Sequence, residues 1–165
     1  MSKPKQPISP ASLTSYRPAN WHQLPDLGLY MDQVILYLEQ NCRPLAAGQG
    51  NFITPAIINN YVKCGLLPRP LGKKYLRGHL AQLVMLCTVK PVATVEEMKR
   101  LFNPGDPDGI ELRYAEFCAT QNAVLDKLQN RPAQQPALTY AIEAAAFRVL
   151  CAEALSTQLE DLARS

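Results

Sequence analysis

The clearest start and stop of a helix lie in the stretch Thr54-Pro-Ala-Ile-Ile-Asn-Asn-Tyr-Val-Lys-Cys-Gly-Leu-Leu-Pro68. The Thr54 hydroxyl can accept a hydrogen bond from an otherwise unpaired first-turn amide, which makes it a good N-cap. Pro55 falls at the first helical position, where its missing N–H costs nothing. Gly65 supplies the left-handed conformation that commonly ends a helix. The stretch therefore predicts a short capped helix followed by a proline-bounded turn.

Charge is unevenly distributed around this helix. No acidic residue lies between Glu39 and Glu96, whereas seven basic residues do, namely Arg43, Lys63, Arg69, Lys73, Lys74, Arg77 and Lys90. Residues 40–95 carry a net charge of +7, residues 1–39 are neutral and residues 96–165 carry −4. Basic charge on a compact helical unit suits a polyanionic partner, so nucleic acid is the leading hypothesis. The alternative is a solvated surface whose carboxylates lie elsewhere.

Length and composition indicate a globular protein. The 165 residues suffice for one domain, or for one domain with an appended helical arm. No stretch approaches the roughly 18 uninterrupted apolar residues of a membrane span, and the N-terminus lacks the apolar segment of a signal peptide. Five cysteines form no Cys-x-x-Cys pair, so neither a disulfide framework nor a zinc ribbon is indicated. We therefore expect a reduced, cytoplasmic setting.

Hydrophobic spacing predicts a mostly helical fold. Prolines make residues 1–20 a predicted flexible tail, with order beginning near Trp21. A first helix is predicted from about Asp26 to Arg43, and the capped helix follows it. Further helices are predicted over about 77–89, 94–102, 110–129 and 137–163, the 94–102 helix opening with a capping box from Thr94 to Glu97. A small two-stranded ribbon around Leu67 and Tyr75 would be the only sheet.

Candidate contact residues follow from the charge and from the capped helix. Phosphate contacts are predicted for Lys63, Arg69, Lys73, Lys74 and Arg77, with surface solubilisation as the alternative. Asn59 and Asn60 are candidates for base or sugar contact, or else ordinary exposed polar residues. Thr54 is a cap at a helix N-terminus that could also seat a phosphate. Tyr61 is predicted to lie in the core, and Tyr75 could be either core or contact.

Features of an enzyme are scarce. The only histidines, His22 and His79, lie in different segments without metal-ligand spacing, and His79 is predicted to lie on a helix surface. The Gly48-Gln-Gly50 segment lacks the preceding strand and the Lys-Ser/Thr of a phosphate-binding loop. Cys64 is predicted at a helix C-terminus, where the helix dipole disfavours a thiolate. We therefore expect no catalytic residue, no metal site and no cofactor.

The C-terminal helix carries a regular seam. Its members alternate at spacings of four and three, which is typical of a coiled coil, and they are Leu138, Ile142, Ala145, Val149, Ala152, Ser156 and Leu159. The seam could pack within the monomer or against a second subunit. A two-fold dimer would present two basic units to paired DNA half-sites, so we expect a homodimer if the protein binds DNA.

The order of these elements resembles the winged helix-turn-helix of MerR-type regulators. Gly65-Leu66-Leu67-Pro68 matches the turn after the second helix of that family, Tyr75 and Arg77 occupy the wing, and Glu96-Glu97-Met98 fits the entry to a short helix. The MerR pattern has a shorter first loop than residues 43–53, and a basic and aromatic pair where this chain has Asn59 and Asn60.

A closer resemblance is to the bacterial domain-of-unknown-function family eighteen thirty-six. It is carried by Leu29-Tyr-Met-Asp-Gln-Val34, Ile58-Asn-Asn-Tyr-Val-Lys63 and Lys73-Lys-Tyr75 with His79-Leu80. The resemblance implies a MerR-like helix-turn-helix domain over residues 21–105, and the last two helices predicted above form a helical pair over 106–165. It implies a DNA-binding transcriptional regulator with a basic wing. The alternative is a module of the same origin that binds proteins without binding DNA.

Overall fold

The computed structural model describes residues 13–46, 50–102, 106, 108–132 and 135–164. Six α-helices lie within these ranges: α2 (Met31–Asn41), α3 (Pro55–Lys63), α4 (Arg77–Val89), α5 (Val95–Phe102), α6 (Ile110–Gln129) and α7 (Ala137–Arg164). Two short 3-10 helices, η1 (Trp21–Gln23) and η2 (Arg43–Leu45), join them. β-structure in the described ranges consists of two isolated antiparallel bridges. The prediction of a mostly helical fold is confirmed.

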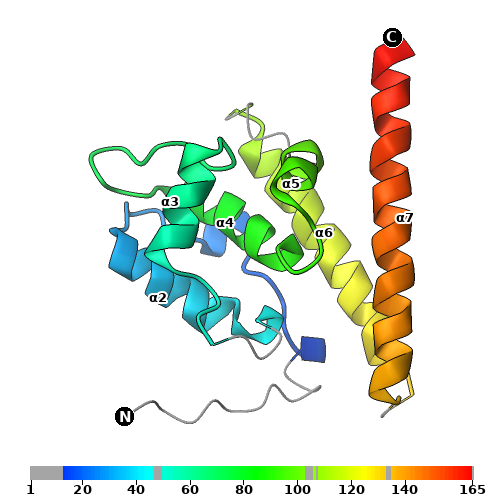
Figure 1. The fold of residues 1–165 in the computed structure, drawn as a ribbon. Coiled ribbons are helices and arrows are strands. Elements are labelled where there is room, and N and C mark those ends of the chain that lie inside the picture. Colours follow the sequence, from blue (N-terminus) through cyan, green and yellow to red (C-terminus); the bar gives the residue numbers. More distant parts are fainter. Residues whose placement is uncertain (1–12, 47–49, 103–105, 107, 133–134, 165) are drawn as a thin grey trace.

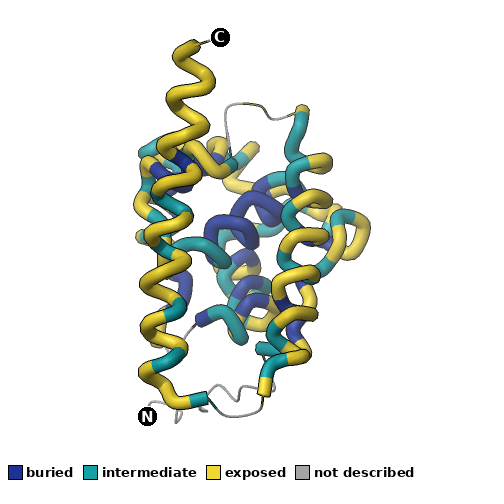
Figure 2. Tube along the Cα trace, turned by 90° about the vertical axis from the view of Figure 1, so that its right-hand side faces the viewer, coloured by how far each residue is buried: buried dark blue, intermediate teal, exposed yellow. Residues whose placement is uncertain are grey.

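Helix α4 forms the centre of the molecule. Nine consecutive residues, 79–87, are buried, and in Figure 2 they lie at the middle of the body. A helix that is apolar on every side must be covered on every side. Helices α2 and α3 lie on one side of α4, while α5 and α6 lie on the other (Figure 1). The core of the domain is therefore built around this helix.

Helix α3 has the predicted caps at both ends. Thr54 Oγ1 accepts a hydrogen bond from the Ile57 amide at 3.3 Å, and Pro55 is the first helical residue. At the other end Gly65 has φ 79°, and the amide of Leu66 donates to the Tyr61 carbonyl at 2.9 Å. This is the six-to-one bond of a Schellman motif, and the buried side chains of Leu66 and Tyr61 supply the apolar contact that accompanies it.

The segment before α2 differs from the prediction. Helix α2 begins at Met31, not near Asp26, because Leu29 is held in extended conformation by Tyr75. The amide of each of these two residues donates to the carbonyl of the other, at 2.9 Å and 2.8 Å. Tyr75 therefore pairs with Leu29, and the ribbon considered possible around Leu67 and Tyr75 is limited to one isolated bridge between Leu71 and Lys74.

The N-terminal segment also differs where it is described. Residues 13–20 lie against α6, whereas the sequence predicts a tail that extends to residue 20. Tyr16 is buried, Arg17 forms a salt bridge with Asp126 at 2.6 Å, and the Tyr114 hydroxyl donates to the Ala19 carbonyl at 2.7 Å. Residues 1–12 of the predicted tail lie outside the described residues.

Helix α7 stands at one side of the body and extends beyond it (Figure 1). Glu97 links it to α5: one carboxylate oxygen accepts from the Thr94 amide at 2.8 Å in the predicted capping box, and the other accepts from Arg148 at 2.8 Å. Leu155 is the one buried residue among those described in α7. None of the described helices has both the length and the apolarity that crossing a membrane requires.

Candidate nucleic-acid interface

The outer face of α3 is polar and uncrowded. Asn59, Asn60 and Lys63 are exposed, and their spacing places them on one side of the helix. Ile58 and Tyr61 on the opposite side are buried, so the position predicted for Tyr61 is confirmed. Thr54 is half-buried, and its hydroxyl already accepts the capping hydrogen bond from the Ile57 amide. The face thus offers two amide side chains and one ammonium group.

The residues after α3 form a tight basic hairpin, here called the wing (Pro68–Leu76). Leu71 and Lys74 exchange both backbone hydrogen bonds, at 3.0 Å and 2.9 Å. The two residues between them, Gly72 and Lys73, have φ of 54° and 65°. Two consecutive positive φ angles are typical of a type I′ turn, the turn that suits a two-residue hairpin. Lys73 therefore lies exposed at the tip in a conformation that glycine or asparagine usually adopts.

One arm of the wing is fixed to the segment before α2. Tyr75 is buried where it forms a bridge with Leu29. The sequence allowed either a core or a contact position for Tyr75, and the structure shows the core position. The stem of Lys74 crosses Gly28 so closely that a Cβ at Gly28 would lie 3.0 Å from the Lys74 Cβ. The Lys74 ammonium then lies 5.5 Å from the centre of the exposed Tyr30 ring, in a cation–π contact.

His79 joins both arms of the wing to α4. Its Nδ1 accepts a hydrogen bond from the Leu76 amide at 3.0 Å, so the neutral ring donates from Nε2 to the Arg69 carbonyl at 3.2 Å. The ring also contacts Tyr75 edge to face. The prediction that His79 lies on a helix surface is wrong, because the side chain is buried beneath the wing. His79 lies three residues after Leu76, the N-cap of α4, and a side chain at this position can accept a hydrogen bond from the backbone amide of the cap. This spacing is the sequence signal that could have predicted the contact.

Three of the seven basic residues in the acid-free window have partners inside the molecule. Arg43 pairs with Glu39 at 3.0 Å, and Lys90 donates to the Phe52 carbonyl at 2.7 Å. Arg77, a predicted phosphate contact, pairs with Asp26 at 3.3 Å and lies over the Trp21 ring. Its side chain is only 22% exposed. These three cations support the fold through contacts within the chain. The positive charge available to a partner is therefore smaller than the seven basic residues of the window suggest.

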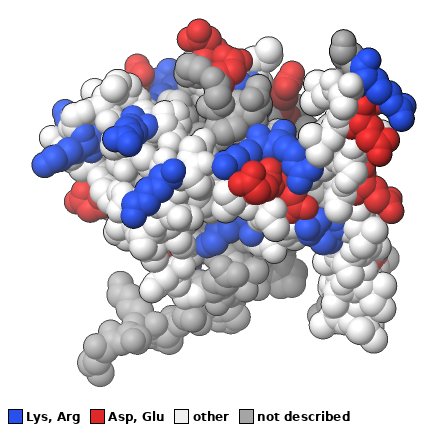
Figure 3. Space-filling model, turned by 45° about the horizontal axis from the view of Figure 1, so that its top comes forward, with Lys and Arg blue, Asp and Glu red and all other residues white. Residues whose placement is uncertain are grey.

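Four basic residues remain at the surface of α3 and the wing. Lys63, Arg69 and Lys73 are exposed and form no salt bridge with any residue in the described ranges, and Lys74 has only the contact with Tyr30. Figure 3 shows blue side chains spaced over the end of the body far from α7, while most red ones lie nearer to α5 and α7. Neither α3 nor the wing contains an acidic residue, so the exposed charge of these two elements is positive.

The described part of the chain contains no cluster of side chains suited to a metal ion, and two of its thiols are deeply buried. No group of three or more His, Cys, Asp or Glu residues there is placed to hold a metal ion. All five cysteines are free. Burial raises the pKa of the Cys42 thiol to about 12 and that of Cys87 still further, so both thiols remain protonated at neutral pH.

Comparison with known proteins gives one family. No curated protein and no solved structure matches the chain. The family described as "Domain of unknown function (DUF1836)" matches residues 19–111, which is more than half of the 165 residues. The matched range runs from just before η1 to the second residue of α6, so it contains α3, the wing and the His79 contacts. The chain therefore belongs to the DUF1836 family.

Proposed function

We propose that this protein is a DNA-binding transcriptional regulator. Helices α2 and α3 would form a MerR-like helix-turn-helix, and the wing would contact the phosphate backbone beside it. The observation that carries the proposal is the set of four exposed cations, Lys63, Arg69, Lys73 and Lys74, on a polar helix face and an adjoining hairpin. Phosphate contacts of this kind supply most of the affinity of DNA-binding proteins, while amide side chains such as those of Asn59 and Asn60 can read base edges.

A protein-binding module is the second candidate. The observation that favours it is the weak charge of α3 itself, whose exposed face has Lys63 as its one cation. The long connection between Asn41 and Thr54 also differs from a tight helix-turn-helix. In this case the same surface would bind a protein, and DNA affinity would be absent even at low salt.

Salt-dependent binding to duplex DNA tests the proposal. Fluorescence anisotropy with a labelled mixed-sequence duplex should show affinity that falls with salt, with a log–log slope of about −0.9 for each phosphate neutralised. The triple variant Arg69→Gln, Lys73→Gln, Lys74→Gln should lower the affinity at least tenfold and reduce the slope by about three.

A matched triple variant controls for net charge. Lys99→Gln, Arg100→Gln and Lys127→Gln remove the same charge from α5 and α6, away from the wing. This variant should bind DNA almost as the native protein does. Equal losses in the two variants would show that only net charge matters and would contradict a wing contact.

We propose in addition that the protein acts as a homodimer through α7. Leu138, Ile142, Val149 and Leu159 of the seam are exposed, so the rest of the described chain leaves these four side chains uncovered. Residues 137–152 contain two charged residues, Glu143 and Arg148, and both already have partners in the same chain. A second copy could therefore cover residues 137–152 without burying an unpaired charge, whereas so apolar a helical stretch is rarely left in water.

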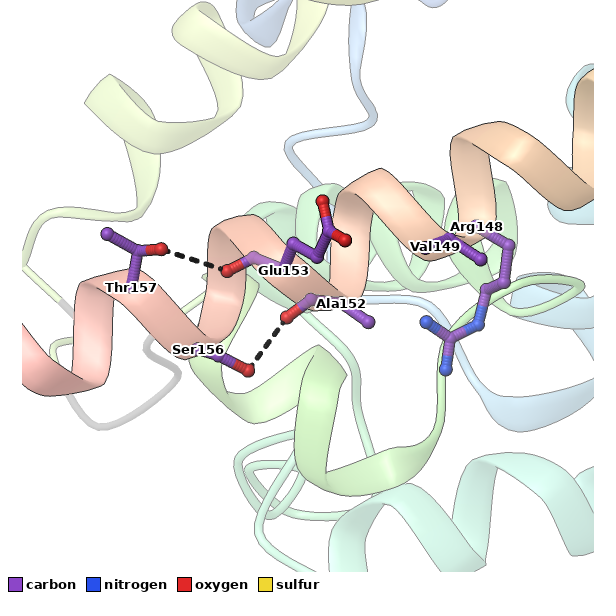
Figure 4. A pocket seen from close by; sticks show the side chains of 6 residues that line it. All are labelled: Arg148, Val149, Ala152, Glu153, Ser156 and Thr157. Atoms are coloured by element: carbon purple, nitrogen blue, oxygen red, sulfur yellow. Dashed lines mark hydrogen bonds between the residues drawn. The ribbon is translucent and has the colours of Figure 1, made fainter.

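A shallow hollow near the centre of the seam supports a dimer through α7. It is lined by six residues of α7 alone, which Figure 4 shows from close by. Four of them, Val149, Ala152, Glu153 and Ser156, have the i, i+3, i+4, i+7 spacing that forms a hole in a coiled coil. Ser156 bonds to the Ala152 carbonyl at 2.9 Å, which keeps its hydroxyl against the helix.

A further inference from the structure

A cavity of about 220 Å³ lies between the base of the wing and two helices. Pro68 and Leu76 border it on the wing side, Gly78 and Gln82 on α4, and Ile110 on α6. Most of the lining is apolar. The volume is somewhat below that of pockets for drug-sized ligands, about 300–1,000 Å³, and suits a small metabolite.

Two of the residues that line this cavity each have a buried nitrogen donor with no hydrogen-bond partner among the described residues. Gln82 is 2% exposed, and its Nε2 is buried and unpaired. Arg113 also lines the cavity, and its Nε is likewise buried and unpaired, although its terminal nitrogens contact Asp106. A buried donor without a partner destabilises the fold, so two of them beside one apolar cavity call for an explanation.

We infer that this cavity binds a small molecule with an apolar body and a carboxylate. The carboxylate oxygens would accept from Gln82 Nε2 and Arg113 Nε, which satisfies both donors with charge-assisted bonds. No Asp or Glu lines the cavity to compete for them. The apolar body would lie against Pro68, Leu76 and Ile110.

Such a ligand would contact the parts that hold the wing in place. His79 lies in the cavity wall and bonds to Arg69 and Leu76 at the two ends of the wing. A bound molecule would therefore favour the wing conformation in which these contacts are made. Ligand binding at this cavity does not require DNA, so it is tested with the protein alone.

Titration with benzoate tests the inference directly. In the NMR spectrum of the nitrogen-labelled protein, benzoate should shift the Arg113 Nε–H and Gln82 side-chain signals in a saturable way in the millimolar range or below. Benzamide has the same apolar ring without the charge and should bind at least tenfold more weakly. Equal binding of the two compounds would overturn the carboxylate assignment, and no saturable shift with benzoate would overturn the site.

Three variants separate binding from folding. Gln82→Leu should weaken benzoate binding at least tenfold while leaving stability unchanged or raised, because it removes an unpaired buried donor. Gly78→Ala narrows the cavity, since the new Cβ lies 3.6 Å from Ile110, and should also weaken binding. Arg113→Met should weaken binding, whereas the control Arg17→Met removes an ion pair at the other end of α6 and should not. Unchanged benzoate affinity in Gln82→Leu and Arg113→Met would contradict the inference.

Discussion

The Nε2 atom of His79 lies 3.2 Å from the carbonyl oxygen of Arg69. The other ring nitrogen accepts from the Leu76 amide, so a single imidazole bonds to both ends of a basic hairpin. Because the ring is buried in α4, the most enclosed helix of the molecule, it fixes the wing to the core.

Replacement of His79 should loosen the wing. His79→Phe keeps an aromatic ring but leaves the Leu76 amide and the Arg69 carbonyl without a partner, which should lower the free energy of unfolding by about 1–3 kcal/mol. Urea unfolding measures the loss, and hydrogen exchange at the Leu76 amide should become faster. His22→Phe, at an exposed position, should change neither quantity. Unchanged exchange in His79→Phe would contradict the role given to the ring.

The same side chain should make stability depend on pH. Burial lowers the pKa of His79 below its ordinary value, and protonation would place a proton on the Nδ1 that accepts from Leu76. The unfolded state therefore binds more protons, so stability is complete above the unfolded pKa of about 6.5 and falls as the pH drops below it. Urea midpoints at pH 5 to 8 should show this slope in the native protein. The slope should be smaller in His79→Phe.

Two glycines should respond in opposite ways to alanine. Gly65 has φ 79°, so Gly65→Ala forces a side chain into the left-handed region and should cost about 1–2 kcal/mol. Gly78 lies in α4 with an ordinary φ and room for a methyl group, so Gly78→Ala should stabilise the protein by about 0.4–1 kcal/mol. Thermal unfolding of the two variants provides the comparison. A shift of the same sign in both would show that backbone conformation does not govern these positions.

A glycine in place of Lys73 at the tip of the wing should raise stability and weaken DNA binding. Lys73 is the only non-glycine residue with positive φ in the described ranges, which strains its backbone. Lys73→Gly should relieve the strain and stabilise the fold by up to about 1 kcal/mol, yet remove one phosphate contact and weaken DNA binding. Thermal unfolding and DNA anisotropy measured on one sample test both halves. A gain in DNA affinity would contradict the proposed contact.

A charge in the α7 seam should separate the subunits of the proposed dimer. Val149→Asp places a carboxylate at the centre of the seam and should raise the dimer dissociation constant at least tenfold in sedimentation equilibrium. Leu36→Asp is a matched control on α2, because Leu36 and Val149 are equally exposed at 57%. A native protein that sediments as a monomer at all concentrations would exclude the dimer, and equal effects of the two variants would place the interface elsewhere.

Features specified by neighbouring residues could be predicted from the sequence. The bounds predicted for α4 and α6 agree with the structure, since both helices are specified by their own apolar spacing. The caps at Thr54 and Glu97 are hydrogen bonds across three residues and were equally predictable.

Features specified by distant residues could not be predicted in this way. The start of α2 depends on Leu29 pairing with Tyr75, and no local pattern indicates that partner. The contacts of Arg77 are a second example, because Asp26 and Trp21 lie far from it in the sequence but beside it in the fold. A count of basic residues in the sequence does not show which of them form ion pairs within the chain. The unpaired donors of Gln82 and Arg113 are visible only once α4 and α6 are packed together.

The pairing of Leu29 with Tyr75 sets the smallest fragment that can retain the wing. A fragment that begins after Tyr30 would leave the Tyr75 amide and carbonyl without their partners and the Lys74 stem without its support at Gly28. Because Tyr75 follows α2 and α3 in the sequence, the pairing of Leu29 with Tyr75 can form only after both helices have been synthesised. Any expression boundary for this domain should therefore lie on the N-terminal side of Gly28.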